Sequence, residues 1–170
     1  MVQSIFLVGP MGSGKTAVGR QLASRLGLPF ADSDAEVELR TGVDIAYIFE
    51  REGEEGFRIR ERDVIDELTS AAGIVLATGG GAILLPVNRE RLATRGTVVF
   101  LDTTIDQQLA RTRRSQHRPL LATADRRAKL EELMRVRDPL YRSIAKITVR
   151  TDGRAAAAVA GDIEKALGNP

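Results

Sequence analysis

The feature that most constrains this chain is a glycine-rich loop between an apolar run and an amphipathic stretch. Gly9, Gly14, Lys15 and Thr16 match the pattern G-x-x-x-x-G-K-[ST], in which successive backbone N–H groups converge on phosphate oxygens. The loop follows the run IFLV and precedes residues with helical spacing, which is the strand, loop and helix context that the motif requires. A chance match is a poor alternative in that context. The loop predicts binding of nucleoside triphosphate phosphates with Mg²⁺, with Lys15 reaching the β- and γ-phosphates.

Short apolar runs separated by longer amphipathic stretches organise the rest of the chain. The runs lie at residues 4–8, 74–77, 97–101 and 147–151, with a weaker one at 29–31. Runs such as IFLV and TVVFL are continuous rather than alternating, which predicts parallel strands covered by helices on both faces. Helical spacing occurs at residues 16–26, 54–71, 106–113 and 125–137, and an alanine-rich helix face at 155–160. The fold class that this alternation predicts is α/β.

Composition narrows the functional classes. A chain of 170 residues with 43% apolar residues predicts one compact domain, and a net charge of +2 does not favour general binding of nucleic acid. The absence of cysteine excludes disulfides and thiolate metal sites, so any metal ion must have oxygen ligands. No apolar stretch is long enough for a membrane span or a signal peptide. We therefore expect a soluble, cytoplasmic protein with no membrane or nucleic-acid partner.

Two carboxylates and three glycines follow predicted strands. Asp32 and Asp34 come directly after the weak run, where a parallel sheet ends near its ligand crevice; one could hold Mg²⁺ through water while the other orients an acceptor hydroxyl. Alternatively, Asp34 caps a helix beginning at Ala35, and the spacing does not decide between these roles. Three consecutive glycines, residues 79–81, follow the run IVLAT, where a turn needs at most two. They predict close approach of the backbone to a ligand, with a permissive strand-to-helix connection as the alternative.

Several arginines are candidates for binding an anion. Arg58 and Arg60 lie on the predicted helix near residue 54, and Arg137 lies just before an Asp-Pro pair. Each could be a solvated helical charge, but the planar guanidinium also suits a carboxylate or phosphate. Residues 114–124 are polar and basic, with Pro119 among them, and predict a mobile loop that closes over the reacting phosphate. His117 in this loop receives no role.

Six motifs give a more specific indication. GPMGSGKT, DSD, GEEGFRIRE, ATGGGA, RPLL and RDPLYR occur in this order, and the chain resembles the shikimate kinase family in their order and spacing. The resemblance implies a three-layer α/β/α fold like that of the P-loop nucleoside monophosphate kinases, with a five-stranded parallel sheet of order 2-3-1-4-5. It also implies a single domain over residues 1–170, with a substrate-binding segment at about 33–62 and a lid at about 112–124. We expect the protein to act as a monomer.

The resemblance also implies a reaction and residue roles. The γ-phosphoryl group of ATP would pass to the 3-hydroxyl of shikimate, giving 3-phosphoshikimate and ADP. The phosphates of ATP would be held by Gly12, Ser13, Gly14, Lys15, Thr16 and Ala17. Arg118 would contact them from the lid, and Arg111 and Arg154 would flank the adenine. Mg²⁺ would be held by Thr16 and Asp32. Shikimate would contact Asp34, Arg58, Gly80 and Arg137. Lys15, Asp34 and Arg118 are the expected catalytic residues, with Asp34 as base, and Arg60 is left outside the site.

Two alternatives stay open at this point. One is a kinase for another small polar acceptor, such as gluconate or a nucleoside monophosphate, on the same scaffold. The combination of Asp34, Arg58, three glycines and Arg137 favours a carboxylated polyol instead. The other is a non-catalytic ATP-dependent switch, which would leave Asp34 without a function. A GTPase is disfavoured because the chain has no N-K-x-D motif.

Overall fold

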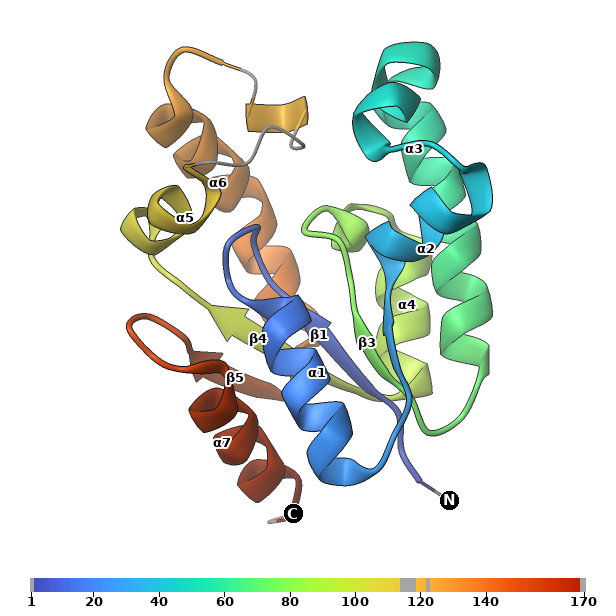
Figure 1. Ribbon diagram of the computed structural model, residues 1–170, viewed down its shortest axis with the longest axis vertical. Coiled ribbons are helices and arrows are strands. Elements are labelled where there is room, and N and C mark those ends of the chain that lie inside the picture. The colour runs from blue at the N-terminus through green and yellow to red at the C-terminus, as the bar shows by residue number, and fades with distance from the viewer. Residues whose placement is uncertain (1, 114–118, 122, 169–170) are drawn as a thin grey trace.

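A parallel sheet forms the centre of the molecule (Figure 1). The computed structural model describes residues 2–113, 119–121 and 123–168. The strands are β1 (Ile5–Val8), β2 (Phe30–Asp32), β3 (Val75–Ala77), β4 (Thr97–Asp102) and β5 (Ile147–Arg150). All neighbours pair in parallel, in the order β2-β3-β1-β4-β5. The predicted order is confirmed.

Helices cover both faces of this sheet. They are α1 (Lys15–Leu26), α2 (Ser33–Thr41), α3 (Ile45–Ser70), α4 (Pro86–Arg95), α5 (Ile105–Thr112), α6 (Arg126–Ile144) and α7 (Ala156–Gly168), with short 3₁₀ helices η1 (Ala82–Leu84) and η2 (Pro119–Leu121). Figure 1 shows α1 and α7 together on one face and α4 and α6 behind the sheet. The predicted three-layer α/β/α architecture is confirmed.

The two faces of β1 explain why its sequence is continuously apolar. Leu7 packs in one buried cluster with Leu22 of α1 and Ile163 of α7. Phe6 packs in a second cluster with Leu92 of α4 and Tyr141 of α6. Since successive side chains of a strand point to opposite faces, a strand covered on both sides must be apolar at every position.

Several helix boundaries agree with the sequence and two do not. Gly27 ends α1 in a left-handed conformation, with φ 66, as expected for a glycine C-cap. The predicted helix at 54–71 is the second part of α3, which begins earlier and breaks at Gly53 (φ 71, ψ −179). The predicted end of the helix at Arg137 is wrong, because α6 continues through Pro139 to Ile144. Proline removes one helical hydrogen bond, and the buried Tyr141 supplies packing that outweighs this loss.

Two groups of helices rise beyond the carboxyl ends of the strands. The phosphate loop lies between α2 with the start of α3 on one side and α5 with the start of α6 on the other (Figure 1). The predicted lid at about 112–124 includes residues 114–118, among them Arg118, and residue 122. All of these lie outside the described residues. In its described part, Leu121 is buried with Met11 and Leu130. Over the described residues, no helix is both long enough and apolar enough to cross a membrane.

Candidate active site

The phosphate loop connects the carboxyl end of β1 to the first turn of α1. Gly14, the N-cap of α1, has φ 89, a left-handed conformation that favours glycine. Since α1 begins at Lys15, the N–H groups of its first turn and its positive dipole end face the loop. The Lys15 ammonium donates to the carbonyl oxygens of Gly9 and Pro10 at 2.7 and 2.9 Å. The loop therefore presents backbone donors and a held cation, which together suit a phosphate group.

A cavity of about 290 Å³ opens beside this loop, and we call it the donor cavity. It is lined by Met11, Gly12, Gly14, Lys15, Thr16, Ala17, Asp32, Asp34, Thr78, Gly79, Gly80 and Arg111. Five of the six residues predicted to hold phosphates are among them, and the sixth, Ser13, is buried.

Asp32 links the donor cavity to the start of α2. Its Oδ2 accepts a hydrogen bond from the Thr16 hydroxyl at 2.7 Å. Its Oδ1 accepts from the backbone N–H groups of Asp34 and Ala35 at 2.9 and 3.1 Å, so Asp32 is the N-cap of α2. The alternative that Asp34 caps this helix is therefore wrong. A hydroxyl and a carboxylate lie side by side here, and such oxygen donors suit Mg²⁺.

Asp34 lies in the first turn of α2 and faces both the donor cavity and a second pocket. The pKa of Asp34 is raised from 3.8 to about 7, first by burial and then by the nearby carboxylates of Glu61 and Asp32, against the opposing charges of Lys15 and Arg58. At neutral pH this carboxyl group can gain or lose a proton, which is a property of a general base.

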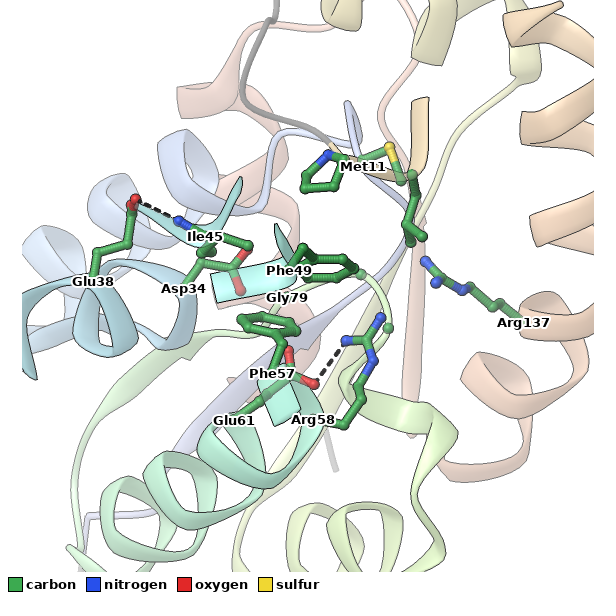
Figure 2. Close-up of a pocket in the computed structure, with 14 residues that line it drawn as sticks. Met11, Asp34, Glu38, Ile45, Phe49, Phe57, Arg58, Glu61, Gly79 and Arg137 are labelled. Carbon is green, nitrogen blue, oxygen red and sulfur yellow. Dashed lines mark hydrogen bonds and ion pairs between the residues drawn. The ribbon is translucent and has the colours of Figure 1, made fainter. Parts of the chain in front are cut away.

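The second pocket, which we call the acceptor pocket, has a volume of about 240 Å³ (Figure 2). Its apolar wall is formed by Met11, Ile45, Phe49, Phe57, Pro119 and Leu120. Its polar and charged lining comes from Asp34, Glu38, Arg58, Glu61, Arg137 and the glycines at 79–81. Four residues, Met11, Asp34, Gly79 and Gly80, also line the donor cavity. The two cavities therefore meet at Asp34.

Two buried arginines reach the acceptor pocket from different helices. Arg58 of α3 is 9% exposed and Arg137 of α6 is 4% exposed, and both guanidinium groups point into the pocket (Figure 2). Arg58 forms ion pairs with Glu61 at 2.9 Å and with Glu54 at 3.1 Å. Among the described residues, no carboxylate lies within ion-pair distance of Arg137. Burial lowers the pKa of Arg137, and the positive charge of Arg58 lowers it further. An anion bound between the two arginines would relieve both effects.

Glu61 belongs to this site, although the sequence analysis gave it no role beyond its helical spacing and its place as the last residue of the motif GEEGFRIRE. It is 0% exposed, and burial raises its pKa against the opposing charge of Arg58. Its Oε1 accepts from the Arg58 Nη1, while its Oε2 has no hydrogen-bond partner among the described residues. The signal available was the spacing of three residues from Arg58 on one helix, which places both side chains on one face.

The triple glycine follows β3 and runs along the floor of the acceptor pocket. A Cβ on Gly79 would lie 2.6 Å from Asp34 Oδ1 and 2.7 Å from Glu61 Oε2. A Cβ on Gly81 would lie 2.3 Å from the Arg58 guanidinium, whereas one on Gly80 would make ordinary contacts. Two of the three glycines therefore make room for charged side chains of the site itself. The predicted close approach is present, but at Gly79 and Gly81 the approaching groups belong to the protein.

The remaining candidate arginines lie in different surroundings. Arg111 lines the donor cavity and donates to the Gly12 carbonyl at 3.3 Å. Arg154 is paired with Asp162 at 2.5 Å and does not line the donor cavity. Arg60, which the sequence left outside the site, is paired with Glu52 on the surface of α3. The placement of Arg111 and Arg154 beside adenine stays a prediction, and so does the role of Arg118, which lies outside the described residues.

Comparison with known proteins agrees over almost the whole chain. The profile of the shikimate kinase family matches residues 11–168. A shikimate kinase from Vibrio cholerae is 57% identical over 165 residues, which cover 97% of this chain and 95% of that protein. One from Thioalkalivibrio sulfidiphilus is 61% identical over 149 residues, covering 88% and 78%. The structure of shikimate kinase from Acinetobacter baumannii in complex with shikimate has a TM-score of 0.97 and 51% identity, covering 98% of this chain and 93% of that chain.

The resemblance indicated by the six sequence motifs is thus confirmed by an independent profile, by sequence identity and by the fold. The profile match includes the phosphate loop from Met11 onward, Asp32, Asp34, the triple glycine and the two buried arginines of the acceptor pocket. The chain belongs to the shikimate kinase family, whose members are kinases that use ATP.

Proposed function

We propose that this protein transfers the γ-phosphoryl group of ATP to the 3-hydroxyl of shikimate, producing 3-phosphoshikimate and ADP. One observation carries the proposal: Arg58 and Arg137 line a pocket that meets the donor cavity at Asp34. Two buried cations favour a carboxylated acceptor, and a carboxyl group at the junction favours an acceptor hydroxyl facing the donor. Shikimate has both groups.

On the acceptor side, Arg58 and Arg137 bind the shikimate carboxylate and Gly80 offers its backbone to the ring. Arg58 is held from behind by Glu61 and Glu54, so its guanidinium is ordered before substrate arrives. The apolar wall that includes Phe49 and Phe57 packs against the carbon ring and excludes water. Preorganisation of this kind reduces the entropy lost when the substrate binds.

On the donor side, the loop residues Gly12 to Ala17 bind the phosphates through backbone N–H groups and the Lys15 ammonium. Mg²⁺ held near Thr16 and Asp32 would neutralise phosphate charge when bound. Arg118 from the lid contacts the transferred group. We further propose that Arg111 and Arg154 flank the adenine, which requires the pair between Arg154 and Asp162 to open.

Asp34 accepts the proton of the 3-hydroxyl as the oxygen attacks the γ-phosphorus in line with the departing ADP. A pKa of about 7 makes this carboxylate a stronger base than an ordinary aspartate, while part of it remains ionised at neutral pH. Little covalent chemistry is required of the protein, because positioning and charge neutralisation supply most of the rate enhancement in phosphoryl transfer.

A coupled assay of ADP release tests this function. Shikimate, gluconate and nucleoside monophosphates are compared as acceptors at equal concentration with ATP and Mg²⁺, and a reaction without acceptor measures ATP hydrolysis. Turnover with shikimate and little with the others is the expected result. Turnover with gluconate or a nucleotide but not with shikimate would show that shikimate is not the acceptor. ATP binding with no turnover of any acceptor would favour the alternative of a non-catalytic ATP-dependent switch.

We also propose that residues 1–170 form one domain, with its substrate-binding segment at about 33–62 and its lid at about 112–124, and that the protein is a cytoplasmic monomer. Buried clusters on both faces of one sheet support the single domain, and the absence of cysteine supports the cytoplasm. Light scattering coupled to size exclusion should give a mass near 18.5 kDa; a mass near twice that value would exclude the monomer.

A further inference from the structure

The peptide between Gly80 and Gly81 lies on the acceptor pocket and is held by a side chain from the core. The Tyr141 hydroxyl donates to the Gly80 carbonyl oxygen at 2.5 Å. Around this contact, the Gly79 N–H donates to the Ser33 hydroxyl at 2.9 Å, and the Gly79 carbonyl accepts from the Ala82 N–H at 3.1 Å. Tyr141 and Ser33 hold the loop from two different helices, and the Ala82 N–H closes the turn within the loop itself.

Tyr141 is rigidly placed for this contact. It is 0% exposed, and its ring stacks on Phe100 of β4 with the ring centroids 5.1 Å apart and an interplanar angle of 23°. Burial raises the pKa of Tyr141, so the hydroxyl keeps its proton and remains a hydrogen-bond donor. Arg137 lies one helical turn earlier on α6, its guanidinium is hydrogen-bonded to the same Tyr141 hydroxyl, and its Nη1 is 3.6 Å from the position of a Cβ on Gly80. One turn of α6 therefore contributes both a buried arginine and the group that holds the glycine backbone.

The orientation of a carbonyl determines the orientation of the N–H in the same peptide. The structure contains no cis peptide bond among its described residues, and in a trans peptide the C=O and N–H point in opposite directions. When the Gly80 carbonyl points to Tyr141 in the core, the Gly81 N–H must point away from it. A peptide between two glycines has no Cβ on either side to restrict rotation, so an outside contact has to select this orientation.

We propose that Tyr141 is a positioning residue for the acceptor: by holding the Gly80 carbonyl, it turns the Gly81 N–H toward the acceptor pocket as a hydrogen-bond donor for the substrate. This inference rests on the proposed function. It also sharpens the role predicted for Gly80, since the Gly80 carbonyl is already bonded to Tyr141 and the backbone groups left for the ligand are N–H donors. Arg58, Arg137 and this peptide then surround one anionic or hydroxyl-bearing ligand.

The test is the variant Tyr141→Phe, which keeps the ring and its packing on Phe100 but removes the hydroxyl. A buried carbonyl left without its donor favours rotation of the Gly80–Gly81 peptide, so the KM for shikimate should rise about tenfold. The KM for ATP and the kcat should change less than about twofold, because the phosphate loop and Asp34 do not contact this hydroxyl. Thr69→Val is the matched control: it removes a buried hydroxyl that donates to the Ile65 carbonyl at 2.7 Å, far along α3, and should alter no kinetic constant.

The outcomes separate this inference from the proposed function. If the wild-type protein turns over shikimate and Tyr141→Phe leaves its KM unchanged, only the role of Tyr141 is overturned; without wild-type turnover the proposed function fails first. Equal changes in the constants for ATP and shikimate, together with a lower Tm, would show a general structural effect and also overturn the inference. Because the Tyr141 hydroxyl is also hydrogen-bonded to Arg137, a second measurement separates the peptide from the arginine: the Gly81 amide proton should shift downfield when shikimate is added to the ADP complex of the wild-type protein, and should not do so in Tyr141→Phe. A Gly81 resonance that is unchanged in the wild type, or that shifts equally in the variant, would contradict the proposal.

Discussion

The donor cavity and the acceptor pocket meet at Asp34, yet they are built in opposite ways. Half of the donor-cavity lining comes from one contiguous stretch within residues 11–17, which contributes backbone N–H groups and one lysine. The acceptor pocket draws its polar groups from α2, α3, the triple glycine and α6, between Asp34 and Arg137 in the chain. A phosphate can be bound by a local turn, because backbone donors suffice. A carboxylated ring requires side chains from several elements.

The two sides also differ in electrostatics. On the donor side, the N-terminus of α1 and Lys15 supply positive charge for the phosphates. In the acceptor pocket, the charged side chains of Arg58, Glu61 and Arg137 are buried. Buried charges reduce stability unless they are paired, and the described part of the chain supplies carboxylates for Arg58 but none within ion-pair distance for Arg137. The acceptor pocket therefore combines Arg58, which has carboxylate partners, with Arg137, which has none among the described residues and can bind an anionic ligand.

The largest expected effect is at the junction of the two sides. Asp34→Asn removes the proposed base without changing the size of the side chain, so kcat should fall by about 10³-fold. Affinity for ATP, measured by calorimetry, should stay near the wild-type value because the phosphate loop is unchanged. Asp63→Asn, at a carboxylate that is 63% exposed beside Arg62, is the control and should keep full activity. A kcat within tenfold of wild type in Asp34→Asn would contradict the role of Asp34 as the base.

The same variant gives a test of stability against pH. The folded-state pKa of Asp34, about 7, lies above its ordinary value of 3.8, so the folded protein binds this proton more tightly than the unfolded chain does. Stability from Asp34 is therefore complete below about pH 4 and is lost as the pH rises through 7. Asparagine does not ionise, so Asp34→Asn should be more stable than wild type at pH 8, by about 1 kcal/mol or more, and the difference should shrink at pH 5. Denaturant unfolding at both pH values measures it.

The contrast between the two sides also explains what the sequence could predict. The phosphate loop could be predicted because its residues are adjacent, and β1, β3 and β4 could be predicted because each is a buried, mostly apolar run; the strands at the two edges of the sheet, β2 and β5, have weaker patterns. The meeting of Arg58 and Arg137 could be proposed only from the family resemblance, since they are far apart in the chain and each resembles an ordinary helical charge. Glu61 was missed because a charged residue at helical spacing is usually solvated. The extension of α6 through Pro139 depends on tertiary packing, which local propensity does not contain.

The second-largest effect is expected from the lid. Arg118→Ala removes the cation proposed to contact the transferred phosphoryl group, so kcat should fall by about 10²-fold. Binding of shikimate, measured by calorimetry, should remain near wild type, because the acceptor pocket has its own arginines. Arg113→Ala, outside both cavity linings, is the control. Loss of shikimate binding in Arg118→Ala would contradict this role and would indicate that Arg118 contacts the acceptor instead.

The two arginines of the acceptor pocket should respond differently to removal. Arg137→Met should raise the KM for shikimate roughly 30-fold, from about 2 kcal/mol of lost carboxylate binding, with little loss of stability. Arg58→Met should raise the KM similarly and also destabilise the protein by about 3 kcal/mol, because Glu61 is left buried without its cation.

Arg60→Met is the control for these two variants, since Arg60 lies on α3 in an exposed pair with Glu52 and its removal should change neither quantity. Kinetics and denaturant unfolding of the three variants measure both quantities. Equal stability of Arg58→Met and Arg137→Met would contradict the distinction between Arg58, which has carboxylate partners, and Arg137, which has none among the described residues.

The smallest expected effect is a shift in the pH dependence of kcat/KM, in which Glu61 of the acceptor pocket influences Asp34 at the junction with the donor cavity. Protonated Asp34 cannot accept a proton, so kcat/KM should fall as the pH decreases through its pKa of about 7. Glu61 is among the charges that raise this pKa, and Glu61→Gln removes the charge while its amide oxygen can still accept from Arg58. The acidic limb of the profile should therefore move to lower pH, by up to about one unit. Glu54→Gln is the matched control, since Glu54 also pairs with Arg58 but is not among the causes of the Asp34 shift. An equal movement in both variants would mean that the profile reports the state of Arg58, and no movement in either would leave burial and Asp32 as the causes of the raised pKa.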